Sequence, residues 1–313
     1  MRIAVKTDHS VGRKTIRLAN ELVNTGVLVV ILLLLVFGCY AIWDSGQVHD
    51  AADKSHYAIY KPTEENEGKT FQELQAINPE VFAWLSVYGT NIDYPVTQGR
   101  DNMKYVNTNA EGKYSLSGSI FLDYNNSKDF SDFNSILYGH HMQKKTMFGE
   151  IGSFSNRYFF DSHRYGNVYY NEKDHGLEFF AFIHTSAYDD TVFTPDVREK
   201  QPYLDTLLAN AVYARDIGVT TEDHILLLTT CSSASTNGRD ILVGRITDEV
   251  YKDPYLNTQT DDENGTMNID GLVKKIVLVN MILAVLLTVL ILVIYHRRKN
   301  SKRSRDNEQK NEK

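Results

Sequence analysis

Cysteine is scarce in this sequence: two among 313 residues, which excludes a disulfide-rich scaffold. Disorder and low complexity are excluded as well, because 42% of the residues are hydrophobic, 23% are charged and no internal repeat is found. The formal net charge is −7 and the acidic residues dominate the middle of the chain. A nucleic-acid partner is therefore not expected.

Two long apolar runs without charge, 26–43 and 276–295, are each long enough to cross about 30 Å of hydrocarbon as a helix. Basic residues gather before the first run and after the second. The positive-inside rule therefore predicts a two-span cell-membrane protein with both termini in the cytoplasm and the middle outside. No small-x-small cleavage site follows the first run promptly, which favours an uncleaved anchor over a signal peptide.

These features divide the chain into seven predicted segments. They are a basic tail 1–25, a transmembrane helix 26–43, a stalk 44–69, an extracytoplasmic domain 70–251, a linker 252–275, a transmembrane helix 276–295 and a basic tail 296–313.

Short segments rich in Val, Ile, Tyr and Phe fill the middle domain and are typical of β-strands. Their regular spacing favours a closed barrel or a sandwich. A long helix is predicted over 197–215 and a shorter one over 147–154. Another short helix should begin at Thr70, in a capping box with Glu73, and end at Asn78-Pro79. The predicted strands cover about 82–88, 92–97, 118–124, 135–142, 166–171, 177–187, 224–231 and 239–247.

Cys231 is the cysteine outside the predicted spans, since Cys39 lies within the first, so it has no partner for an intrachain disulfide. It ends an apolar strand and opens into a small-residue loop, a place from which a nucleophile can reach solvent. A buried structural cysteine is the alternative, because free cysteine is among the most buried residue types. The residues around Cys231 do not separate these two interpretations.

A nucleophilic thiol needs a partner that generates or stabilises the thiolate, and histidine is the usual one. Of the ten histidines, the pair His140-His141 is best placed, because it follows an apolar strand directly after Gly139. Neighbouring residues on a strand point to opposite faces, so only one of the two can face a given cysteine. No metal site is expected, since no third ligand stands at a recognisable spacing. The acidic stretch 123–129 lacks the glycine and the final acid of a calcium loop.

Arg239 stands eight residues after Cys231, at the start of a predicted strand. If residues 232–238 form a hairpin-like loop, Arg239 lies beside the thiol, where a fixed cation favours a thiolate and an oxyanion. Arg245 is the competing candidate, because it lies six residues further on and shares the same face of the strand.

Several further motifs follow one another over residues 70–250. They are Asn78-Pro79-Glu80-Val81-Phe82-Ala83-Trp84-Leu85, Ile92-Asp93-Tyr94-Pro95-Val96-Thr97-Gln98-Gly99, Gly118-Ser119-Ile120-Phe121-Leu122-Asp123-Tyr124, Tyr138-Gly139-His140-His141-Met142, Met147-Phe148-Gly149, Leu228-Thr229-Thr230-Cys231 and the strand beginning at Arg239. Their order and spacing resemble those of the sortases, the membrane-anchored cysteine transpeptidases of Gram-positive bacteria, and specifically class B. A second membrane span and basic tail are more typical of pilus-building sortases of class C, and are the main departure from class B.

The resemblance implies a mainly-β fold: an eight-stranded barrel with an N-terminal helix and a helix before the strand that carries the cysteine. It also implies Cys231 as nucleophile, His140 as general acid and base, and Arg239 as the residue that stabilises the oxyanion, with no cofactor and no metal. The implied reaction cleaves a C-terminal sorting signal of a secreted protein after threonine and transfers the protein, through a thioester, to an amine. The implied acceptor is an amine of a cell-wall precursor peptide or a lysine of a pilin.

Three alternatives remain from the sequence. The chain could polymerise pilins, it could be a surface cysteine protease that releases its substrate to water, or it could be a non-catalytic binding module that keeps the barrel. Incorporation of an added amine separates a transpeptidase from a protease. Absence of selective reactivity at Cys231 would favour the binding module.

Overall fold

The computed structural model describes residues 9–63, 68–232 and 236–256. Contacts divide the described chain into two units, one that ends at Gly46 and one that begins at Gln47.

A helix, α1 (His9–Ala52), carries the first predicted span. Its segment Leu18–Asp44 is long and apolar enough to cross a membrane, judged by length and composition, and contains the predicted run 26–43. It is the one such candidate among residues 9–63, 68–232 and 236–256. The predicted span 276–295 and tail 296–313 lie outside the described residues, so the two-span topology stays a prediction.

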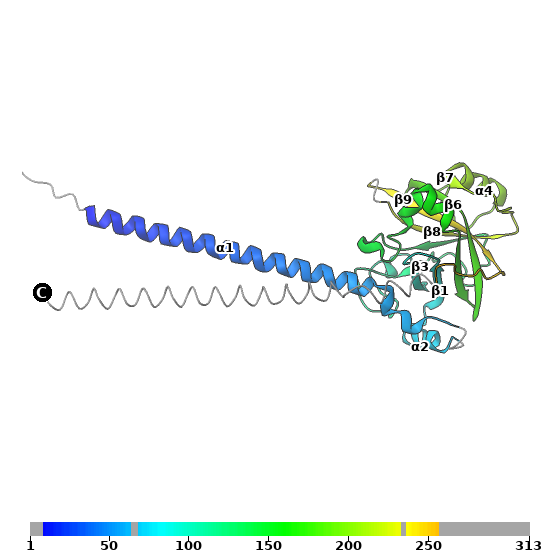
Figure 1. Ribbon diagram of the computed structural model, residues 1–313, viewed down its shortest axis with the longest axis horizontal. Coiled ribbons are helices and arrows are strands. Elements are labelled where there is room, and N and C mark those ends of the chain that lie inside the picture. The colour runs from blue at the N-terminus through cyan, green and yellow to red at the C-terminus, as the bar shows by residue number, and fades with distance from the viewer. Residues whose placement is uncertain (1–8, 64–67, 233–235, 257–313) are drawn as a thin grey trace, which may run out of the picture. The chain divides into compact units, whose positions relative to one another are not determined.

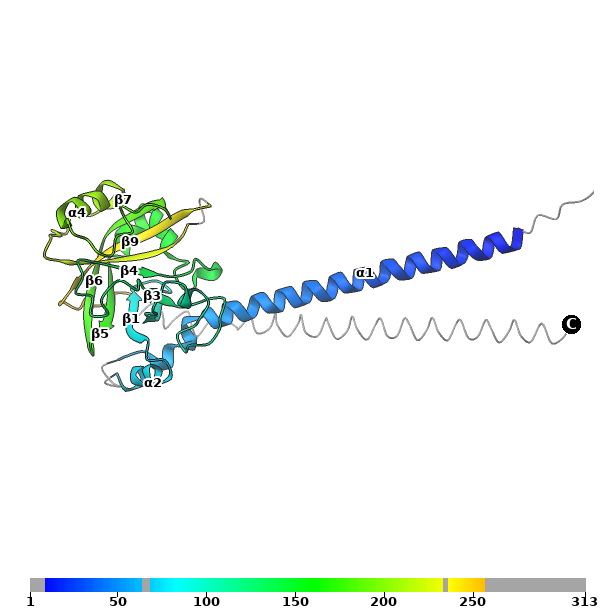
Figure 2. The same cartoon turned by 180° about the vertical axis from the view of Figure 1, so that it is seen from behind.

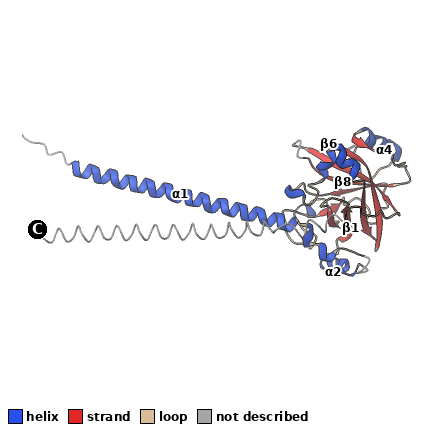
Figure 3. Cartoon of the chain, viewed as in Figure 1, coloured by secondary structure: helices blue, strands red, loops and turns tan. Residues whose placement is uncertain are grey.

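A closed barrel forms the middle domain (Figures 1 and 2). Eight strands pair in the order β5-β1-β2-β3-β4-β8-β9-β6, and a β5–β6 pairing closes the ring. The ninth strand, β7, pairs with β6 outside this ring. The predicted eight-stranded, mainly-β barrel is therefore confirmed, and strands dominate the domain in Figure 3. The strands are β1 (Val81–Val87), β2 (Asp93–Thr97), β3 (Ile120–Leu122), β4 (Asn134–Tyr138), β5 (Tyr165–Tyr170), β6 (Lys173–Ser186), β7 (Ala211–Ala214), β8 (His224–Cys231) and β9 (Gly238–Thr247).

Two hydrophobic clusters lie on opposite faces of the barrel wall, because successive strand residues alternate in direction. Leu226 and Leu228 of β8 join the larger cluster, which fills the interior. Leu227 joins the smaller cluster together with Leu204 and Leu207 of α4 (Lys200–Ala209), which covers the outer face beside β6 and β7. The odd-numbered side chains of β8, up to Cys231, therefore point outward.

The helix predicted over 197–215 is too long. α4 ends at Ala209, and the next residues form β7, whose Tyr213 pairs with Phe182 of β6. Pairing with an open strand edge outweighs the helical periodicity there, since β-branched and aromatic side chains suit a pleated surface. The helix before the cysteine-bearing strand is nonetheless present.

The capping box predicted at Thr70 is wrong. Helix α2 (Lys69–Ile77) begins after Gly68, which has a φ of 72°, and Thr70 donates its hydroxyl to the Lys61 carbonyl at 3.4 Å. The end predicted at Asn78 is confirmed, since the Asn78 N–H donates to Leu74 O.

The short helix predicted over 147–154 is confirmed only in its second half, and as a 3-10 helix. This is η5 (Ile151–Ser155). A separate helix, α3 (Arg157–Ser162), follows it, and its cap is the Asn156 side chain, which accepts from the Phe159 N–H. The remaining 3-10 turns are η1 (Lys54–His56), η2 (Ala58–Tyr60), η3 (Lys104–Val106) and η4 (Gln143–Lys145).

Part of the segment predicted as a stalk packs on the barrel domain. Ala52 and Tyr57 are buried in the main cluster. The Tyr94 hydroxyl donates to Ala52 O at 2.9 Å and accepts from the Met147 N–H at 3.0 Å. One buried hydroxyl thus ties this extension to β2 and to the loop after β4.

Candidate active site

The three predicted site residues line one cavity of about 380 Å³ on the domain. Cys231 is the last residue of β8 and is exposed. Arg239, in β9, is its direct partner across the antiparallel pair. His140 comes two residues after the end of β4. The structure therefore brings together three residues that are up to 99 positions apart in sequence (239 − 140 = 99).

Strand register explains why the histidine reaches the cysteine. β4 and β8 run parallel, with Tyr138 opposite Thr229. The Gly139 N–H donates to Thr229 O at 3.2 Å and extends this pairing by one residue. His140 and Cys231 each lie two residues beyond the Tyr138–Thr229 pair, so the parallel register brings them to the same end of the sheet.

A hydrogen bond fixes the ring of His140. Its Nε2 lies 2.8 Å from the carbonyl oxygen of Val106 in η3. A carbonyl oxygen only accepts, so Nε2 carries the hydrogen and Nδ1 is the ring nitrogen left for proton exchange. The backbone is fixed too, since the Phe148 N–H donates to His140 O at 3.1 Å.

Glycine is required before this histidine. A Cβ on Gly139 would lie 2.6 Å from the buried ring of Phe148, closer than side-chain carbons approach. The aromatic ring can therefore pack directly beneath the strand end that carries His140.

The two candidate arginines have different surroundings. Arg239 lines the cavity, and its Nη1 donates to the Gly238 carbonyl at 3.2 Å. Arg245 is bound instead to the buried Glu178, with Nη2 2.8 Å from Oε2, and its Nη1 lies 3.9 Å from Oδ1 of Asp223. Of the two, Arg239 is the one at the cavity, and Arg245 takes part in an ion-pair network of the barrel.

The sequence interpretation missed a polar network on the cavity wall. Buried Asp123 accepts hydrogen bonds from the Asn102 side chain at 2.7 Å and the Tyr138 hydroxyl at 3.1 Å. Burial and the nearby carboxylate raise the pKa of Tyr138, although Arg239 lowers it somewhat, so the hydroxyl stays neutral. Asn102 lies in an irregular segment between β2 and β3, where no sequence periodicity marked it.

No family model matches the sequence. Sortase B of Listeria monocytogenes is 31% identical over 180 residues, a match that covers 56% of this chain and 73% of that protein. Sortase B of Staphylococcus aureus is 27% identical over 231 residues, covering 70% of this chain and 94% of that protein.

Solved structures agree. A sortase B from the type II pilus of Streptococcus pneumoniae is 45% identical, with a TM-score of 0.51, over 57% of this chain and 99% of that one. A class B sortase of Streptococcus pyogenes involved in pilus biogenesis is 41% identical, with a TM-score of 0.54, over 57% and 99%. The chain belongs to the class B sortases. A Staphylococcus aureus sortase B–substrate complex is also similar, at 28% identity and a TM-score of 0.53, over 64% and 92%.

Family membership supports a cysteine transpeptidase function for this sortase. The predicted resemblance, on motifs between residues 70 and 250, is thereby confirmed at the level of the family.

Proposed function

We propose that this sortase cleaves a C-terminal sorting signal after threonine, holds the protein as a thioester on Cys231, and transfers it to an amine. The observation that carries the proposal is the meeting of Cys231, His140 and Arg239 in one cavity on the outer face of the barrel. An exposed thiol beside a hydrogen-bonded imidazole and a guanidinium has the parts that acyl transfer requires.

In the first half-reaction the Cys231 thiolate attacks the threonine carbonyl carbon. Arg239 stabilises the oxyanion with its fixed positive charge. The C–N bond breaks as protonated His140 gives its Nδ1 proton to the leaving amine. Carbon–sulfur replaces carbon–nitrogen, so the energy of the peptide bond is kept in the thioester and no ATP is needed.

In the second half-reaction a neutral amine attacks the thioester carbonyl carbon. A C–N bond forms, the C–S bond breaks, and the electron pair returns to the Cys231 sulfur. His140 accepts the proton that the nitrogen loses, which restores the starting pair of thiolate and imidazolium.

A membrane location suits this reaction, because two substrates held at one surface meet at a raised effective concentration. We place Leu18–Asp44 of α1 across the cell membrane and the barrel outside the cell, with the apolar run 276–295 as a second span. Both basic termini then lie in the cytoplasm.

Pilin polymerisation is the second candidate, with a pilin lysine in place of a cell-wall amine. Two of the similar structures belong to sortases of pili, which favours this candidate. Hydrolysis by water, as in a cysteine protease, is the third outcome that an experiment must distinguish.

Product analysis of the full chain in detergent micelles tests the proposal. The enzyme is mixed with a library of threonine-containing peptides, with and without triglycine, a diaminopimelate tripeptide or Nα-acetyl-lysine amide, and the products are identified by mass spectrometry. Wild type should yield amine-ligated product, and Cys231→Ala should yield none. Cys39→Ala, a matched control in α1, should behave as wild type. Cleavage without ligation to any amine would favour a protease, and no adduct in folded wild type would favour a binding module.

A further inference from the structure

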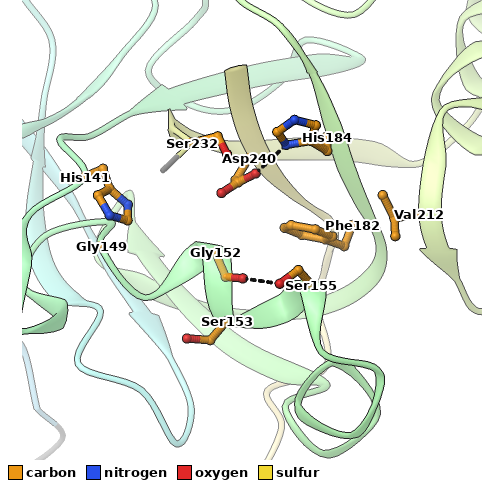
Figure 4. A pocket seen from close by; sticks show the side chains of 10 residues that line it. All are labelled: His141, Gly149, Gly152, Ser153, Ser155, Phe182, His184, Val212, Ser232 and Asp240. Atoms are coloured by element: carbon orange, nitrogen blue, oxygen red, sulfur yellow. Dashed lines mark hydrogen bonds and ion pairs between the residues drawn. The ribbon is translucent and has the colours of Figure 1, made fainter. Parts of the chain in front are cut away.

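A second cavity, of about 430 Å³, lies beside the strand ends that carry the proposed catalytic residues, and Figure 4 shows the side chains that line it. Phe182 of β6, which lines it, belongs to the cluster that fills the barrel interior. His184 and Asp240 line it from positions that continue the same interior face toward the strand ends. The thiol cavity, in contrast, opens on the outer face.

The two cavities share one wall. Three residues of the second cavity each follow a proposed catalytic residue directly in sequence. They are His141, Ser232 and Asp240, which follow His140, Cys231 and Arg239. The two cavities therefore meet at the ends of β8 and β9, with the Asp240 and Cys231 side chains on opposite faces of this strand pair.

A carboxylate dominates the polar character of the second cavity. The Asp240 side chain is only 8% exposed, and its Oδ1 accepts from Nδ1 of His184 at 2.8 Å across the β6–β9 pair. Figure 4 shows this carboxylate and the His184 ring at the cavity, with the His141 ring on another wall. No lysine or arginine is among the described residues that line it. A cationic group is therefore the favoured occupant.

The walls also suit a short hydrocarbon chain. Phe182 and Val212 supply apolar surface beside the carboxylate. On the wall facing the Asp240 carboxylate, Gly152 has no side chain, and a Cβ there would lie 3.1 Å from Oδ2. Methylene groups ending in an ammonium match this combination of an apolar wall and a buried negative charge.

We propose that this second cavity binds the acceptor amine as an ω-ammonium group on a methylene chain, the chemistry of a lysine or diaminopimelate side chain. The proposal rests on the proposed transpeptidase function and adds the place and the recognition of the second substrate. The ammonium pairs with Asp240, and the methylenes lie against Phe182 and Val212. To react, the amine leaves Asp240, loses one proton to solvent and passes the ends of β8 and β9, where the neutral nitrogen attacks the thioester and His140 accepts the second proton. Asp240 and His184 act as specificity-determining residues.

Acceptor kinetics test this proposal with the full chain in detergent micelles. The peptide that acylates wild type best is held constant, and the KM is measured for Nα-acetyl-lysine amide, a diaminopimelate tripeptide and triglycine. Acyl-enzyme formation, which needs no acceptor, is measured separately by intact mass. Asp205→Asn on α4, an exposed carboxylate that lines neither cavity, is the matched control.

The factor by which Asp240→Asn raises the KM for Nα-acetyl-lysine amide should be at least ten times the factor by which it slows acyl-enzyme formation. Gly152→Ala should also raise this KM severalfold, because its methyl group occupies the space beside Oδ2. Asp205→Asn should change neither quantity. The lower KM of the two ω-amines identifies the source as a pilin-type lysine or a wall-type diaminopimelate.

Three results would overturn the proposal. One is an unchanged acceptor KM in both folded variants while acylation proceeds, which leaves the proposed function standing. Another is triglycine with a lower KM than both ω-amines. The third is wild type that forms no acyl-enzyme, which removes the proposed function and this inference together. If Asp240→Asn does not fold by circular dichroism, Gly152→Ala decides.

Discussion

Gly118 lies just before β3, against the segment that holds the ring of His140. Its φ is 58°, and a Cβ there would lie 2.5 Å from Tyr105 O and 2.6 Å from Val106 O. Both are backbone atoms, so no side-chain rotation makes room for a methyl group. Val106 O is also the acceptor for Nε2 of His140 at 2.8 Å. Gly118→Ala should therefore disturb both stability and the proposed catalytic base.

The size of the effect follows from two costs. A left-handed backbone costs a residue other than glycine about 1–2 kcal/mol, and forcing a methyl group into packed atoms costs about 1–3 kcal/mol more. Gly112→Ala is the matched control, because Gly112 has a φ of 79° and its nearest obstacle, Asn78 Cγ, is 4.0 Å away. It should bear the first cost alone.

Thermal unfolding and acyl-enzyme formation of the two variants provide the comparison. The free energy of unfolding of Gly118→Ala should be lower than that of Gly112→Ala by about 1–3 kcal/mol. In a domain of 150–250 residues, each kcal/mol of lost stability lowers the Tm by about 2–4 °C. Displacement of His140 should slow acyl-enzyme formation about 10–100-fold in Gly118→Ala and not in Gly112→Ala. Equal Tm values and equal rates in the two variants would refute this account of how His140 is positioned.

Three further predictions concern the site arginine, a loop carboxylate and a buried hydroxyl. Arg239→Lys keeps the charge but loses the planar fork of the guanidinium, so the rate of acyl-enzyme formation should fall at least about tenfold at unchanged stability. Arg245→Lys should instead lower the Tm, because Arg245 binds a buried glutamate. The reverse pattern would contradict the assignment of Arg239 to the site. Burial raises the pKa of Asp189, but hydrogen bonds from two threonine side chains and from backbone N–H groups outweigh it and hold the pKa below its ordinary value. Its stabilisation is therefore present above about pH 4 and lost as the pH falls, so Asp189→Asn should lower the Tm at pH 7 and progressively less below pH 4, and a constant loss across this range would count against it. Tyr94→Phe removes the acceptor of the buried Met147 N–H and should cost about 1–3 kcal/mol in chemical denaturation; no loss would mean that another group satisfies this N–H.

The barrel could be predicted from the sequence because its strands carry a local signal. Runs such as 224–231 are apolar and rich in leucine, and β8 covers these same residues. The strand β7 could not be predicted from the sequence, since Ala211–Ala214 continues an apparently helical pattern and becomes a strand only by pairing with β6. The start of α2 was misplaced for a similar reason: Gly68 in a left-handed conformation begins the helix, and the Thr70 hydroxyl finds its partner in Lys61.

The meeting of Cys231 and Arg239 could be predicted as well, because both flank one loop and the hairpin register places them opposite each other. The role of Val106 could not, since it comes from an irregular segment whose position depends on tertiary packing. The Asp240–His184 pair was missed because the two residues are 56 positions apart and meet only through the β6–β9 register.

Intact-protein mass spectrometry of the full chain with its best sorting peptide tests the central claim most directly. Wild type should gain the mass of the peptide up to and including threonine, peptide mapping should place the adduct on Cys231, and hydroxylamine should release it, as expected for a thioester. Cys231→Ala should gain nothing, and Cys39→Ala should gain the same mass as wild type. An adduct that persists in Cys231→Ala, or peptide cleavage by that variant, would contradict the assignment of Cys231 as the nucleophile.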